Sequence, residues 1–315
     1  MKLELKDINK SYGEHHVLKG INIVAESGQA LGLLGRNGAG KTTTIRILMD
    51  VFGADSGEIL LDGKPIDHNK ISMGYLPEER GLYPKKKISD QLIYLAQLKG
   101  MGKAEASDAL TLWLKRLGMS EYRDARLDTL SKGNQQKIQL ITAVIHNPDI
   151  VVLDEPFSGL DPVNAMILED VVKREIEAGK IVLFSSHQMN YVEEFCDRIA
   201  ILNKGEIVLS GEIYDIKRSY SRDRLVIRTE KPDPICSAYG SAVKQNEDGS
   251  LMLKMDKPED KKRIMEEITS KYEVDEIRVY EPTMNDIFVE YTDDRQAEAV
   301  SETEFSQDSE IGGDD

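Results

Sequence analysis

The apolar positions in the first part of the chain predict strands followed by a helix. Apolar and polar residues alternate at the start of the chain, as in an edge strand, and short strands are expected over 3–8 and 17–24. Residues 30–34 form a short apolar run, which predicts a buried strand. A glycine-rich turn leads from it to a helix expected over 43–52, and another strand is expected over 58–62.

The middle of the chain, from about 82 to 147, has the periodicity of helices instead. Ser89 is expected to cap the first helix, and a third helix is expected from Ser131 to about His146. The second helix is indicated by an apolar face made of Ala106, Leu110, Trp113, Leu114 and Leu117. We therefore expect a helical subdomain inserted into the α/β part.

After Pro148 the alternation of strands and helices resumes. The predicted strands are 150–153, 181–184 and 199–202, and the predicted helices are 163–178 and 189–197. Asp161 and Pro162 are typical of the N-cap and first position of a helix. Alternation of this kind predicts a parallel sheet whose ligand binds at the carboxyl ends of the strands.

The remainder predicts a smaller α+β domain and a tail. Strands are expected over 225–227, 251–253 and 276–280, with a helix over 259–271. The predicted domains are 1–220, 221–292 and an acidic tail, 293–315. The tail holds nine acidic residues and one basic residue, and is expected to be disordered because it has few large apolar residues.

Charge and composition narrow the possible functions. The net charge of −15 argues against a basic surface for nucleic acid, and no apolar run approaches the length of a membrane-spanning helix. Any membrane role is therefore expected to be peripheral. The two cysteines, Cys196 and Cys236, lack metal-ligand spacing, which favours a reducing compartment such as the cytoplasm.

A phosphate-binding loop follows the buried strand at 30–34. The chain reads Gly35-Arg36-Asn37-Gly38-Ala39-Gly40-Lys41-Thr42, which matches the pattern G-x-x-x-x-G-K-[ST]. Glycines let the backbone curl until successive N–H groups face one anion. The expected ligands of ATP are Gly35, Asn37, Gly38, Gly40, Lys41, Thr42 and Thr43, with Lys41 on the β- and γ-phosphates and the Thr42 hydroxyl on Mg²⁺.

Two acidic residues end the apolar strand at 150–153. Asp154 and Glu155 lie where one carboxylate would hold Mg²⁺ through water and the next would polarise the water that attacks the γ-phosphate. The alternative is a solvated strand end before a turn, and the phosphate loop in the same chain argues against it.

Further motifs carry a resemblance to the ABC ATPases over about residues 1–215. Leu130-Ser131-Lys132-Gly133-Asn134-Gln135-Gln136-Lys137 resembles their signature sequence, Ser158-Gly159-Leu160-Asp161 resembles the D-loop, and His187 resembles the switch histidine. Tyr12 lies where the adenine-stacking aromatic falls. The resemblance implies a P-loop NTPase ABC cassette, α/β in class, with a mainly parallel sheet, antiparallel edge strands and an inserted helical subdomain.

The same resemblance assigns roles to these residues. Ser131, Gly133 and Asn134 would close over the γ-phosphate held by a second copy of the chain, giving an ATP-dependent homodimer. Asp161 and His187 would act in hydrolysis beside Glu155. Tyr12 could instead be a core strand residue, and His187 a strand-end histidine with a satisfied hydrogen bond.

The chain departs from the family pattern at two places. Glu78 replaces the glutamine of the Q-loop and is expected to ligate Mg²⁺ as a carboxylate. Lys132 and Asn134 replace a glycine and a glutamine of the signature, which leaves its backbone donors in place.

The segment Gly74–Lys85 and the end of the small domain, Glu281–Phe288, resemble the ATPases of sodium-efflux (NatA-like) exporters. That resemblance implies an exporter subunit, peripheral at the cytoplasmic face of the membrane, which drives a separate permease. The alternative is a soluble ABC ATPase that acts on ribosomes or DNA. A P-loop kinase or GTPase would have no reason to carry the signature and the switch histidine.

Overall fold

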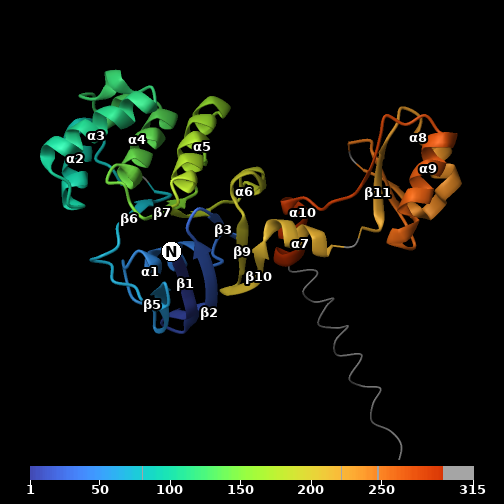
Figure 1. Cartoon of the computed structure of the whole chain (residues 1–315), viewed down its shortest axis with the longest axis horizontal. Coiled ribbons are helices and arrows are strands. Elements are labelled where there is room, and N and C mark those ends of the chain that lie inside the picture. The colour runs from blue at the N-terminus through green and yellow to red at the C-terminus, as the bar shows by residue number, and fades with distance from the viewer. Residues whose placement is uncertain (80, 221, 247, 294–315) are drawn as a thin grey trace, which may run out of the picture. The chain divides into compact units, whose positions relative to one another are not determined.

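The computed structural model describes residues 1–79, 81–220, 222–246 and 248–293 (Figure 1). They belong to two compact units. The first comprises Met1–Ile213 and the chain from Ile287 onward, and the second comprises Tyr214–Asp286. The predicted division between 220 and 221 falls just after helix α7 (Ile213–Ser219). Apart from Asp293, the predicted acidic tail lies outside the described residues.

The first unit is built on two sheets. In the larger sheet five parallel strands are flanked by one antiparallel edge strand, in the order β10 (Glu206–Glu212), β9 (Arg198–Asn203), β3 (Ala30–Gly35), β8 (Ile181–Ser185), β7 (Ile150–Asp154) and β6 (Met73–Leu76). The smaller sheet is antiparallel, in the order β2 (His15–Glu26), β1 (Lys2–Tyr12), β4 (Ser56–Leu61) and β5 (Lys64–Pro65). The predicted mainly parallel sheet is therefore confirmed, with β10 as its one antiparallel edge strand, while the other antiparallel strands of this unit form a sheet of their own.

One apolar core joins the two sheets. Leu5 and Ile21 of the antiparallel sheet belong to the same buried cluster as Leu33 and Val152 of the parallel sheet. Helix α1 (Lys41–Leu48) contributes Ile45, which is fully buried. The core thereby fixes the phosphate-loop helix to the strand that precedes it. The outer helices of this unit are α5 (Pro162–Glu177) and α6 (Met189–Phe195).

The predicted helical subdomain is present as α2 (Ile88–Leu98), α3 (Lys103–Arg116) and α4 (Lys132–Val144) (Figure 1). The predicted cap at Ser89 is wrong, because α2 begins at Ile88 with Lys87 as its N-cap. The Ser89 hydroxyl instead donates to Asp124 Oδ1 at 2.9 Å. Short 3₁₀ turns cover Ser120–Tyr122 and Leu127–Thr129.

Strand β6 and helix α4 come unusually close together at Gly74. A Cβ atom added at Gly74 would lie 1.8 Å from the Ala143 carbonyl oxygen. Because this obstacle is backbone, any larger side chain would have to push the helix away from the strand. Glycine at this position thus lets the strand that leads to Glu78 lie directly against the helix that starts at the signature sequence.

The second unit is a small α+β domain, as predicted. Its antiparallel sheet has the order β12 (Val243–Gln245), β13 (Leu251–Lys254), β11 (Arg224–Arg228) and β14 (Glu276–Val279), and its helices are α8 (Pro232–Tyr239) and α9 (Lys261–Lys271). Short 3₁₀ turns cover Gly240–Ala242 and Pro258–Asp260. Leu225, Ile235 and Ile268 are fully buried in its own apolar core.

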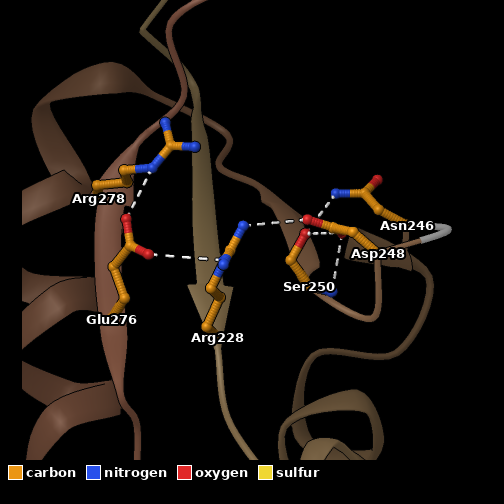
Figure 2. Close-up of polar contacts among 6 residues, drawn as sticks. All are labelled: Arg228, Asn246, Asp248, Ser250, Glu276 and Arg278. Carbon is orange, nitrogen blue, oxygen red and sulfur yellow. Dashed lines mark hydrogen bonds and ion pairs between the residues drawn. The ribbon is translucent and has the colours of Figure 1, made fainter.

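Polar contacts connect three parts of this small sheet (Figure 2). Arg228 lies between Asp248 and Glu276, with Nη2–Oδ2 and Nε–Oε2 distances of 3.3 and 3.6 Å, and Arg278 also pairs with Glu276. Asp248 in turn accepts from the Ser250 hydroxyl at 2.6 Å. These ion pairs are solvent-exposed, so water and salt screen them and each adds little to the stability of the domain.

The last described helix, α10 (Met284–Thr292), begins in the second unit, and from Ile287 onward its residues belong to the first. Within the described residues, no helix combines the length and the hydropathy that crossing a bilayer requires.

Candidate nucleotide site

A cavity of about 750 Å³ opens in the first unit at the carboxyl ends of the parallel strands. This is where a parallel sheet is expected to bind its ligand. Among the residues predicted from the sequence, those that line it are Gly35, Asn37, Gly38, Gly40, Lys41, Thr42, Thr43, Glu78, Asp154, Glu155 and His187. The structure therefore brings together the phosphate loop, the two strand-end carboxylates, the Q-loop position and the switch histidine.

The phosphate loop has the backbone that its glycines permit. Gly38 and Gly40 have φ angles of 82° and 112°, which L-residues with side chains rarely adopt. A Cβ atom at Gly40 would also lie 2.6 Å from the side chain of Leu18. Helix α1 starts at the next residue, so its free N–H groups and positive dipole end face the cavity.

Lys41 is held inside the loop. Its side chain lines the cavity, the residue is only 8% exposed, and its ammonium group donates to the Gly35 carbonyl oxygen at 2.7 Å. Among the described residues, the hydrogen bonds of this ammonium group go to carbonyl oxygens, and such a buried charge favours an anion nearby because desolvation makes unpaired charge costly. The cavity floor thus suits a polyphosphate.

Asp154 is oriented by the neighbouring strand. Parallel register places it beside Ser185, whose hydroxyl donates to Asp154 Oδ1 and accepts from the Glu155 N–H at 3.1 Å. The other carboxylate oxygen, Oδ2, is buried and has no hydrogen-bond partner among the residues that the structure describes. Burial raises the pKa of the Asp154 carboxyl above its ordinary value, and the Ser185 hydrogen bond opposes that shift.

These features fit a divalent cation at the carboxylate. Oxygen ligands such as the Asp154 carboxylate and the Thr42 hydroxyl are those that Mg²⁺ prefers, and a cation beside Oδ2 would offset the cost of burying its charge. Tyr75 of β6 also lies close to this carboxylate. Burial, followed by the charge of Asp154, raises the pKa of Tyr75 to about 12, so its hydroxyl stays protonated.

Glu155 adopts a strained backbone conformation. Its φ of 50° is in the left-handed region, which costs an L-residue about 1–2 kcal/mol. Strain of this kind concentrates at functional sites, where the surrounding structure maintains it. His187 Nδ1 lies 2.8 Å from Glu155 Oε2, and the His187 side chain is 61% exposed. The predicted catalytic carboxylate and switch histidine are therefore in contact.

Tyr12 does not line the cavity. It pairs with His15 across the β1–β2 hairpin, and it is His15 and Val17 that line the cavity wall there. The Tyr12 ring lies edge-on against Phe52, with 6.1 Å between the ring centroids, and the residue is 50% exposed. It is thus not a core residue of its strand, and its contact with adenine stays a prediction.

The signature residues also lie outside the cavity wall. Ser131 caps α4 by accepting from the Asn134 N–H at 3.3 Å, as its position predicted. Gly133 packs against Asn164 of α5, whose N–H donates at 3.0 Å to the cap residue Asp161. The chain therefore has a second helix N-terminus, apart from that of α1, and its positive dipole end can attract an anion.

The sequence reasoning missed several residues at this site. Ser185 donates a hydrogen bond to Asp154, and Tyr75 lies close to the same carboxylate. The other missed residues line the cavity and are His15, Val17, Arg36 and Phe288. Arg36 lies inside the phosphate-loop motif and could have been found there. The others come from different strands or from the far end of the chain, and no local pattern assigns them to this cavity.

Comparison with known proteins agrees with this geometry. Residues 18–158 match the family model described as ABC transporter, and residues 211–292 match that of the ATP-binding protein DrrA1-3-like, C-terminal domain. A solved structure titled as the ATP-binding subunit of an ABC transporter superposes with a TM-score of 0.64 at 29% identity, covering 69% of this chain and 92% of the other.

Three relatives from Bacillus subtilis are similar over most of their length. The uncharacterized ABC transporter ATP-binding protein YhaQ is 40% identical, covering 91% of this chain and 97% of the relative. The linearmycin resistance ATP-binding protein LnrL is 32% identical over 71% and 73%, and the ABC transporter ATP-binding protein NatA is 33% identical over 64% and 85%. With this fold, this site and these relatives, the chain belongs to the ATP-binding proteins of ABC transporters.

Proposed function

We propose that this protein binds and hydrolyses ATP to drive an exporter, and that it does so as a homodimer against a separate membrane permease. The observation that carries the proposal is the single cavity in which Lys41, Asp154 and Glu155 converge. It combines a basic, amide-rich floor for phosphates with a carboxylate that fits a cation and a second carboxylate, beside His187, that can act on water.

Each group in the cavity has a task in that reaction. The phosphate-loop N–H groups and Lys41 orient the triphosphate, and Thr42 and Asp154 would hold Mg²⁺. When bound, Mg²⁺ neutralises charge that develops on the phosphate oxygens. Glu155 accepts the proton of the attacking water, and His187, 2.8 Å away, stabilises the orientation of the Glu155 carboxylate. Water attacks the γ-phosphorus, the bond to the β-phosphate oxygen breaks, and ADP leaves with the bonding electrons.

Closure between two copies is supported by the position of the signature. Ser131 and Gly133 lie at the start of helix α4, and neither residue lines the cavity of its own chain. Such a helix N-terminus favours binding of an anion, and the γ-phosphate of ATP bound to a second copy of the chain would be that anion. Asp161 would approach the same junction, because it caps the helix whose Asn164 packs on Gly133.

Glu78 is expected to contribute to the Mg²⁺ affinity of the site. It is exposed to the cavity beyond the end of β6, so its carboxylate can reach a cation on the phosphates. Replacing Glu78 with alanine should raise the Mg²⁺ concentration needed for half-maximal ATPase activity by about tenfold. Glu79→Ala, which removes an exposed charge that does not line the cavity, is the matched control. An unchanged Mg²⁺ dependence, ATPase rate and transport rate in Glu78→Ala would remove Glu78 from the site.

The export direction is supported by one relative. LnrL is named for resistance to linearmycin, a function that export would explain. The sodium-efflux assignment has narrower support, from the similarity to NatA alone. We keep sodium as one cargo to be tested.

Purification of the tagged protein from detergent-solubilised membranes tests the exporter assignment. We expect a multi-span membrane protein to co-purify in a stoichiometric amount, and ATPase activity to change when the two are reconstituted together. Ribosomes or DNA as the stoichiometric partner would overturn the assignment in favour of a soluble ABC ATPase.

A further inference from the structure

The last described helix of the chain reaches the nucleotide cavity. Phe288 of α10 lines the cavity together with the phosphate loop, although almost 250 residues separate them in the sequence. Phe288 belongs to the part of the chain that returns to the first unit at Ile287. The site is therefore not made by the cassette sequence alone.

The second half of α10 is fixed to the first unit by packing and by a hydrogen bond. Ile287 is completely buried and Thr292 is 1% exposed. Asn203, the last residue of β9, donates from Nδ2 to the Tyr291 carbonyl oxygen at 3.3 Å. Since Tyr291 lies three residues after Phe288, the two positions share one side of the helix. This contact holds Phe288 toward the end of β9.

The turn that follows Asn203 shows which end of the cavity Phe288 occupies. The Gly205 N–H donates to the Ala39 carbonyl in the phosphate loop at 3.1 Å, and the Gly205 carbonyl accepts from Lys19 of β2 at 2.8 Å. A Cβ atom at Gly205 would lie 2.4 Å from the Val17 carbonyl oxygen. The turn thus packs directly against β2, at the end of the cavity lined by His15 and Val17. Phe288 therefore lies at that end.

The two ends of the cavity differ in chemistry. In the parallel sheet β9 lies on one side of β3, and β8, β7 and β6 lie on the other. Glu78, Asp154, Glu155 and His187, which end or follow these last three strands, form the end suited to the γ-phosphate, its cation and water. Val17, the imidazole of His15 and the ring of Phe288 offer apolar and flat surfaces instead. Among the described residues of the cavity wall, Phe288 is the only one with a benzene ring. A flat apolar surface beyond the phosphate loop suits a purine base.

We infer that Phe288 contacts the base of the bound nucleotide, so that the C-terminal helix completes the ATP site and helps to select a nucleotide over a bare polyphosphate. This rests on the proposed function, because it assumes that the cavity binds ATP. The residue is assigned to binding and not to the chemical step, since the hydrolytic groups lie at the other end.

Calorimetric titration of Phe288→Ala with MgATP and with magnesium tripolyphosphate tests the inference. Aromatic contacts with a base are worth enough that their loss should weaken ATP binding roughly tenfold. Tripolyphosphate, which has no base, should bind the variant as it binds the original protein. Val289→Ala is the matched control, because Val289 neighbours Phe288 on α10 but is 43% exposed and does not line the cavity.

A second variant distinguishes the contribution of the aromatic ring to ATP binding from its contribution to the packing of helix α10. Phe288→Leu keeps an apolar side chain in the helix, and we expect it to lower ATP affinity with an unchanged thermal unfolding midpoint. An equal loss of affinity for ATP and tripolyphosphate, or no loss for either, would overturn the inference. Failure of the original protein to bind either ligand would instead overturn the proposed function.

Discussion

Replacing Glu155 with glutamine is expected to reduce the ATPase rate by a factor on the order of 10²–10⁴, which is the rate acceleration that a positioned general base usually contributes. Glutamine keeps the shape of the side chain but cannot take the proton of the attacking water. The backbone should be unaffected, because the Ser185 hydroxyl accepts a hydrogen bond from the backbone N–H of residue 155, which glutamine also has. ATP binding should persist, since Lys41 and the phosphate loop are unchanged.

The same variant should accumulate as a dimer. If hydrolysis opens the closed pair, a chain that binds ATP but hydrolyses it slowly remains closed. Size-exclusion chromatography with MgATP should then show a peak of twice the monomer mass, which ADP should not produce. Glu177→Gln is the charge-matched control, since Glu177 is exposed at the end of α5. A wild-type rate would exclude Glu155 as the base, and a monomer at saturating ATP would count against closure between copies.

Lys41→Ala is expected to weaken ATP binding by about 2–4 kcal/mol, which is roughly 30- to 1000-fold in Kd. An ammonium group at contact distance from a phosphate gains this much near a protein surface, even though the whole chain carries a charge of −15. Repulsion from distant acidic residues is screened over about 8 Å at physiological salt, so it does not offset the local contact.

Isothermal titration calorimetry measures the effect of Lys41→Ala directly. Because Lys41 also bonds to the Gly35 carbonyl, the thermal unfolding midpoint should be measured in parallel to show that the loop is still folded. Lys64→Ala removes one positive charge at an exposed position of β5 and should leave affinity unchanged. If Lys41→Ala kept wild-type affinity, the phosphates would not lie on this loop.

Elements with strong local signals were predictable. The phosphate loop and its helix follow from a glycine pattern that acts within eight residues, and α4 and α5 begin after Ser131 and Asp161 as their capping chemistry indicates. Strands β3, β7 and β8 were predicted because their wholly apolar runs are buried along their entire length.

Short elements with weak signals were not predicted. Strand β6 has four residues and includes Gly74, which disfavours a strand by propensity but is required by the approach of Ala143. Ser89 has the chemistry of a cap, yet tertiary contact with Asp124 uses its hydroxyl and the helix begins one residue earlier. In both cases a distant partner decided the outcome.

The sequence by itself determined where the phosphate-loop motif lies, which strand ends in carboxylates, and which family pattern the chain follows, because each depends on neighbours within a few positions. Only the tertiary structure decided that Ser185 orients Asp154, that His187 touches Glu155 and that Phe288 enters the cavity. Those pairings depend on the order of strands in the sheet and on the path of the returning helix. Periodicity reports which face of an element is buried, but not which other element covers it.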